Sequence, residues 1–150
     1  MQKIKFKEAL IKLIKSHNTP RGIALGVAIG VFIAILPLYG LHTVMVIIFA
    51  ILIPQANKLA ILLGTNISLP PTVATITWTA YDIGRFILIN KDYPPLSWSY
   101  FKKIRPEVFK DFYYPLFLGS VILGLLCAVV FYYITLFIAE KIQRRRLYGK

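Results

Sequence analysis

Two long apolar stretches, each interrupted by proline, dominate the pattern of hydrophobic and polar positions. The first spans residues 22–53 and contains no Asp, Glu, Lys or Arg. About twenty apolar residues suffice to cross a bilayer, so this stretch is too long for one straight helix. Pro37 and Gly40 stand near its centre, where proline removes a helical hydrogen bond and glycine permits a sharp turn. The pattern predicts half-helices at about 22–36 and 41–53 that form a re-entrant hairpin.

The second apolar stretch, residues 59–89, is interrupted by GTNISLPP at residues 64–71. Pro70 and Pro71 suit the first turn of a helix that follows the interruption. The shift that aligns Pro37 with Pro71 also aligns Thr43 with Thr77 and a pair of glycines, which is a weak internal repeat that chance could also produce. Paired interrupted segments are typical of transporter-like proteins with a binding site near the midplane of the membrane.

The composition agrees with a membrane protein. The 150 residues are 57% hydrophobic, with a mean hydropathy of +0.67, far above that of an ordinary soluble domain. The net charge of +12 would suggest nucleic acid in a soluble chain. The basic residues lie outside the apolar stretches, so membrane topology and anionic lipids explain them more simply, and we expect no nucleic-acid partner.

The flanking segments complete the predicted organisation. Residues 1–18 form a basic amphipathic pattern that suits the surface of an anionic leaflet, or alternatively the protein's own surface. Residues 19–89 form the core with two interrupted segments. Residues 90–111 form an interfacial loop of aromatic and basic residues, residues 112–139 a transmembrane helix, and residues 140–150 a basic tail.

The fold class that follows is an all-α membrane protein with broken, re-entrant helical hairpins and about two full transmembrane helices. Both chain ends are basic, which predicts cytoplasmic termini and an even number of crossings. The last apolar segment and residues 72–89 are the expected crossings. The 90–111 loop then lies outside despite its lysines.

Small residues recur at every fourth position in two segments. In a membrane this spacing lets two helix backbones approach closely, so the two faces are expected to pack on each other or on a second copy, as in a homodimer. The residues are Gly22, Gly26, Gly30 and Ala34 in the first segment and Ser120, Gly124 and Ala128 in the last.

Polar residues near the two interruptions are the candidate ligand-binding groups. Helix N-termini attract anions, and ionisable groups inside a membrane are functional candidates. Alternatively, Arg85 extends to the interface, Asp82 is only its partner, and His42 is a hydrogen-bonded helix cap. The candidates are His42, Thr43, Asn66, Ser68, Asp82 and Arg85.

Catalysis has little support in the sequence. The histidines, the single Cys127 and the carboxylates show no metal-binding spacing, and no glycine-rich phosphate loop is present. Ser68, His42 and Asp82 are only a formal nucleophile–base–acid set. We expect no enzyme, no metal and no cofactor.

Three segments resemble the bacterial membrane family DUF2062. They are TPRGIALGVAIGVFIAILPLYGLHT, LLGTNISLPPT and the Gly84-Arg85 region. At the second interruption this chain has Leu69-Pro70 where the family usually has Asn-Pro, so a polar contact there is lost or relocated. The resemblance implies an integral membrane protein, often beside or fused to glycosyltransferases of envelope pathways, with no established activity. DedA-type proteins, which handle lipid phosphates, offer a looser architectural analogy.

Two functions follow as expectations. The first is a multi-pass protein of the bacterial inner membrane that binds or translocates an anionic lipid head group or small anion in envelope biogenesis. The second is a scaffold that anchors an envelope enzyme such as a glycosyltransferase. Anionic membrane lipids are expected partners in both.

Overall fold

The computed structural model describes residues 19–38, 40–67, 70–88 and 106–148, and these contain helices and no strand. The predicted all-α class is therefore confirmed for the described residues. The predicted amphipathic segment at 1–18, Ser68 and most of the predicted loop at 90–111 lie outside them. The elements are α2 (Pro20–Ile35), α3 (His42–Leu52), α4 (Lys58–Gly64), the 3-10 helix η1 (Thr65–Ile67), α5 (Pro70–Ile87) and α6 (Pro106–Tyr148).

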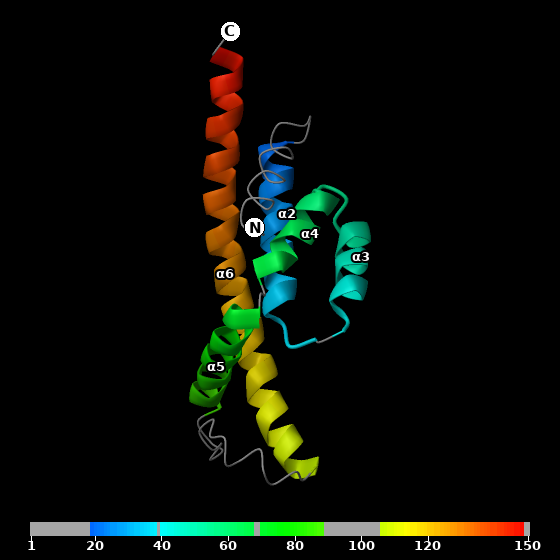
Figure 1. Cartoon of the computed structure of the whole chain (residues 1–150), viewed down its shortest axis with the longest axis vertical. Helices are drawn as coiled ribbons and strands as arrows, with labels where there is room; N and C mark the ends of the chain where they lie inside the picture. Colours follow the sequence, from blue (N-terminus) through cyan, green and yellow to red (C-terminus); the bar gives the residue numbers. More distant parts are fainter. Residues whose placement is uncertain (1–18, 39, 68–69, 89–105, 149–150) are drawn as a thin grey trace.

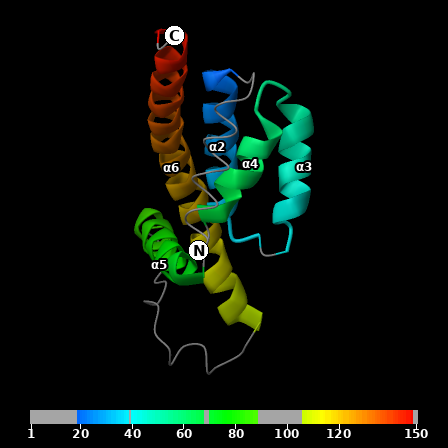
Figure 2. The same cartoon turned by 45° about the horizontal axis from the view of Figure 1, so that its top comes forward.

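Helix α2 forms the centre of the fold. It lies between α6 and α4, with α3 outermost (Figures 1 and 2), and most of its residues are buried. The hydroxyl of Thr19 caps its start by accepting a hydrogen bond of 3.1 Å from the Gly22 N–H. Ile23, in the first turn, shares one apolar cluster with Ala139 and Ile142 near the end of α6. The two helices run antiparallel, with the start of α2 and the end of α6 at the same end of the molecule (Figure 1).

The predicted break in the first apolar stretch is confirmed. Helix α2 ends at Ile35 and α3 begins at His42, and Gly40 between them has φ +86°. The chain turns back there, so α3 runs beside α2 and α4 toward the end where α2 begins (Figure 1). At that end the Asn57 N–H donates a 2.9 Å hydrogen bond to the Gly22 carbonyl oxygen. The segment is thus a closed helical hairpin.

Replacing Gly40 by alanine should destabilise the protein by about 1–2 kcal/mol, because a left-handed backbone angle brings a Cβ too close to the next carbonyl. A Cβ at Gly40 would meet no atom within 4 Å, so backbone conformation alone sets this cost. Thermal unfolding in detergent measures it. Gly40→Asn serves as the control and should lose less stability, since asparagine tolerates this conformation; equal losses would contradict the explanation.

The second break differs from the first. It follows η1 and precedes α5, and Figure 1 shows α5 continuing away from the end where α4 begins. The prediction of two hairpins is therefore wrong for this segment, which bends without turning back. A single 3-10 turn continues a helix with a tighter winding, whereas the first break contains a glycine with positive φ.

Within the chain, the glycine stripe of α2 packs on α4 and not on the second stripe. A Cβ at Gly26 would lie 2.5 Å from the carbonyl oxygen of Asn57 and 2.7 Å from Cβ of Ala60. Gly124 of the second stripe instead faces α2 through the ring of Phe32. The expected packing of the two faces on each other is therefore wrong, whereas packing on a second copy stays a prediction.

Helices α5 and α6 cross through two glycines that the sequence analysis did not single out for packing. A Cβ at Gly84 would overlap the carbonyl of Pro115, and one at Gly119 would overlap the carbonyl of Ala80. The ring of Tyr81 stacks on that of Phe112, with centroids 5.2 Å apart. These contacts hold the second half of α5 closely against the start of α6.

Helix α6 is longer than predicted at both ends. It begins at Pro106, inside the predicted 90–111 loop, and continues to Tyr148, inside the predicted 140–150 tail. Figure 1 shows its first turns slanting away from the rest, as expected around the internal Pro115. Its Phe112–Arg144 portion is the one part of the described chain long and apolar enough to cross a membrane. Helix α5 was the other expected crossing. Its threonines, Asp82 and Arg85 make it too polar to count as a second membrane-capable helix in the described chain.

Candidate functional site

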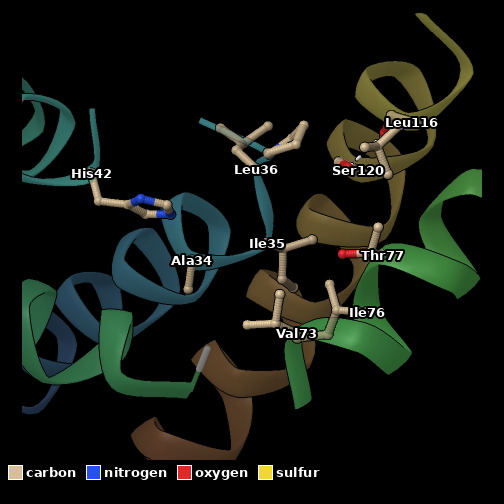
Figure 3. Close-up of a pocket in the computed structure, with 10 residues that line it drawn as sticks. Ala34, Ile35, Leu36, His42, Val73, Ile76, Thr77, Leu116 and Ser120 are labelled. Atoms are coloured by element: carbon tan, nitrogen blue, oxygen red, sulfur yellow. Dashed lines mark hydrogen bonds between the residues drawn. The ribbon is translucent and has the colours of Figure 1, made fainter. Parts of the chain in front are cut away.

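A small cavity lies where the first break meets α5 and α6 (Figure 3). Its volume is about 20 Å³, which accommodates one water-sized group. The two interrupted segments therefore converge, since the cavity takes residues from the first break and from the first turns of α5. The lining residues are Ala34, Ile35, Leu36, Pro37, His42, Val73, Ile76, Thr77, Leu116 and Ser120.

His42 is the lining residue with an unsatisfied polar atom. It is the first residue of α3, and Nε2 of its ring is buried without a hydrogen-bond partner in the described part of the chain. The alternative prediction of a hydrogen-bonded cap is wrong, because Leu41 occupies the N-cap position with no side-chain bond. An unsatisfied buried polar atom costs about 1–3 kcal/mol. A bound water or ligand oxygen at the cavity would offset that cost.

The other polar groups around the cavity already have partners. The Ser120 hydroxyl, 1% exposed, donates a 2.6 Å hydrogen bond to the Leu116 carbonyl oxygen. The Tyr113 hydroxyl donates to the Pro37 carbonyl oxygen at 3.4 Å, which ties α6 to the break. Figure 3 places His42 on one side of the pocket, with Thr77 and Ser120 on the other. The site is thus one imidazole opposite two hydroxyls, within otherwise apolar walls.

Two of the other predicted ligand residues lie away from this cavity. Thr43, beside His42, is exposed and does not line it. Asn66 is also exposed, and its side-chain amide donates a 3.1 Å hydrogen bond to the Leu62 carbonyl oxygen at the end of α4. Asn66 therefore satisfies a helix C-terminus, and Ser68 lies outside the described residues.

Arg85 and Asp82 form a pair of their own near the far end of α5. The guanidinium lies 3.9 Å from the Asp82 carboxylate, and the two side chains are 37% and 46% exposed. Their predicted pairing is confirmed. At 1.5 Å per residue, Arg85 lies roughly 18 Å along the helix from Val73, and neither charged residue lines the cavity. An exposed pair of this kind contributes about 0–1 kcal/mol.

Sequence reasoning missed the role of two hydroxyl residues. Ser120 was expected only as a small packing residue, and Thr77 only as one match of the internal repeat. A serine in a long apolar helix is a usable signal, whereas Thr77 is one of several threonines in α5. Among the described residues no three His, Cys, Asp or Glu side chains lie close enough together to bind a metal ion.

In the described residues these features define an all-helical fold with one membrane-capable helix and a broken helical hairpin whose tip borders a small cavity. Residues 3–147 match the family described as "Uncharacterized protein conserved in bacteria (DUF2062)". The chain belongs to this family, which confirms the resemblance. No curated protein and no solved structure matches the chain.

Proposed function

We propose that the chain is a multi-pass protein of the bacterial inner membrane. Only 11% of the residues in an apolar window of α6 are buried, whereas a core helix of a soluble protein would be mostly buried. Large apolar residues are also exposed on other helices, among them Ile51 at 72%, Leu59 at 62% and Phe86 at 80%. Exposed apolar surface of this extent indicates an apolar surrounding, and a lipid bilayer supplies it.

The hairpin of α2 and α3 would be re-entrant in this arrangement. Helix α2 has 16 residues, about 24 Å at 1.5 Å per residue, which is short of the roughly 30 Å of a hydrocarbon core. Its first turn and the last turns of α6 lie at the same end of the molecule (Figure 1). The exposed cations Arg21, Lys58, Lys141 and Arg144 belong to that end, which the positive-inside rule places in the cytoplasm.

We propose further that the cavity at the hairpin tip binds an oxygen of an anionic group, from a lipid head group or a small anion. The unpartnered Nε2 of His42 carries this proposal, because a ring N–H there would donate to such an oxygen. The first N–H groups of α3 add a partial positive charge beside it. A cavity of about 20 Å³ admits one oxygen, so the rest of the anion would occupy the mouth.

Replacing His42 by alanine should weaken binding of a phosphate-containing lipid at the hairpin tip about tenfold while folded yield stays normal. A hydrogen bond to a charged group contributes about 1.5–3 kcal/mol, and tenfold corresponds to about 1.4 kcal/mol. Binding is measured by native mass spectrometry of the full chain in neutral detergent, titrated with short-chain phosphatidylglycerol. Transport is measured as flipping of a fluorescent lipid in vesicles.

Two further variants separate this proposal from its competitors. Arg85→Ala removes a cation far from the cavity and should leave binding within twofold. His42→Gln keeps a polar donor and should retain more affinity than His42→Ala. If His42→Ala binds like the unmodified chain, or if Arg85→Ala loses as much, the cavity is not the anion site.

Helix α3 favours a second proposal, a scaffold that anchors an envelope enzyme. None of its residues is buried, so its outer face is available to a helix of another membrane protein. A normal phenotype for His42→Ala, together with loss of function when Ile47 and Ile51 on the exposed face are changed to serine, would support the scaffold over the binding protein.

A further inference from the structure

A second, larger groove lies at the opposite end of the molecule from the hairpin tip. It measures about 320 Å³ and is formed by the start of α2 and the link between α3 and α4. This volume falls in the range of small-ligand sites, about 300–1,000 Å³. The lining residues are Thr19, Gly22, Pro54, Gln55, Ala56, Asn57, Lys58 and Leu59, none of which is acidic.

The groove walls are rigid because backbone groups join them. The Asn57 N–H donates to the Gly22 carbonyl oxygen at 2.9 Å, and the Ala56 N–H donates to the Ile53 carbonyl oxygen at 3.0 Å. Asn57 also caps α4, since its Oδ1 accepts a 2.9 Å hydrogen bond from the Ala60 N–H. The link between α3 and α4 is therefore held against the first turn of α2.

The same hydrogen bonds determine which groups remain for a ligand. Because Oδ1 of Asn57 is occupied, the remaining group is Nδ2, a donor. Gln55 offers a further amide, and Lys58 offers an ammonium group; both residues are exposed. Within the described part of the chain no hydrogen bond or ion pair engages these three donors. Three donors, one of them charged, suit an anion with several oxygens.

The surroundings of the groove favour a lipid as the source of that anion. Leu59 in its wall is 62% exposed, and Leu52, two residues before Pro54, is 69% exposed. Polar donors bordered by exposed apolar side chains match a phosphate group with its acyl chains. The neighbouring cations, including Arg21, are typical of the side of a membrane that faces anionic lipid.

We propose that this groove binds the phosphate of an anionic phospholipid through Lys58, Gln55 and Asn57. The site is separate from the cavity at the hairpin tip, and the choice of a lipid as the source rests on the membrane placement proposed above. Free phosphate shares the same chemistry, so the test must distinguish the two sources.

The test titrates the full chain in neutral detergent with short-chain phosphatidylglycerol and detects bound lipid by native mass spectrometry. Native mass spectrometry counts bound lipids, so a lipid in this groove is distinguished from one at the hairpin tip. Lys58→Gln should weaken the groove's own binding step at least tenfold and leave the other step unchanged. Asn57→Asp should do the same, because it keeps the oxygen that caps α4 but replaces the donor with a negative oxygen. Since Lys58 is exposed and the Asn57 cap is retained, both variants should unfold at the temperature of the unmodified chain.

Lys141→Gln is the matched control. It removes the same charge from an exposed lysine at the same end of the molecule, outside the groove, and should change binding less than twofold. Equal losses for Lys58→Gln and Lys141→Gln, or no loss for either, would overturn the proposal. His42→Ala should leave the lysine-dependent binding intact, which separates failure at this groove from failure at the hairpin tip.

Two competitors identify the source of the anion. Phosphatidylcholine carries a phosphate without net negative charge and should bind at least fivefold more weakly than phosphatidylglycerol. Inorganic phosphate at millimolar concentration should displace little of the lipid. Full displacement by inorganic phosphate, with no preference between the two lipids, would contradict a lipid site.

Discussion

Replacing Gly30 by valine is expected to destabilise the folded chain by about 3 kcal/mol, the upper end of typical overpacking costs. Even a Cβ at this position would overlap the carbonyl oxygen of Ile61, and it would lie 2.7 Å from Cα of Gly64. Both neighbours are backbone, so no side chain can move aside. The valine must push α4 away from α2, which disrupts the cluster of Ile29, Ile33, Ala56 and Ile61.

Thermal unfolding in detergent, followed by circular dichroism, measures this loss. A loss of 3 kcal/mol in a chain of this size lowers Tm by on the order of 10 °C. Ala74→Val is the control, because it places the same branched side chain in a helix at an exposed position of α5. If the Gly30→Val and Ala74→Val variants melt at similar temperatures, the close contact between α2 and α4 does not require glycine at position 30.

Local signals in the sequence were sufficient to predict the breaks. Proline and glycine act on the backbone of their own neighbourhood, so Pro37 and Gly40 predicted the end of α2 and the start of α3 within a few residues. At the start of α2 the side chain of Thr19 caps the helix and Pro20 occupies its first turn, which are again local effects. The direction of the chain after each break was harder to predict, because it depends on the turn conformation and on packing against α2.

The partner of each small-residue face could not be predicted from spacing. A repeat at every fourth position shows that one face of a helix is small, but it says nothing about which helix covers it. Gly26 and Gly30 pack on α4, a helix of seven residues within an apolar stretch. Gly84 and Gly119 belong to no long stripe, yet each lies against the backbone of the other helix at the crossing of α5 and α6.

The candidate site was predicted in part. The pairing of two interrupted segments predicted that they converge, and His42 was singled out because it follows the first break. Arg85 was grouped with His42 because both are ionisable groups in apolar stretches. The two residues do not share a site, because the cavity meets α5 near its start, at Val73, Ile76 and Thr77, whereas Arg85 lies near the end of that helix. Sequence reasoning lacked this information because it could not say which turn of α5 faces the break.

Replacing Gly84 by leucine is expected to cost about 3 kcal/mol and to open the cavity at the hairpin tip. A Cβ at Gly84 would overlap the carbonyl group of Pro115, so a leucine must separate α5 from α6. That movement breaks the cluster of Ala80, Tyr81 and Leu116. Leu116 and the start of α5 line the cavity. Separating α5 from α6 at Gly84 should therefore also widen the cavity beside His42.

The opening is measured at position 120. Ser120 is 1% exposed, so a cysteine placed there, with Cys127 changed to serine, should react with a maleimide slowly. The Gly84→Leu substitution in that background should accelerate labelling at least tenfold and lower Tm by on the order of 10 °C. Thr79→Leu, which adds the same side chain to an exposed position of α5, should change neither. Slow labelling in a destabilised Gly84→Leu protein would mean that the crossing supports the fold without controlling access to the cavity.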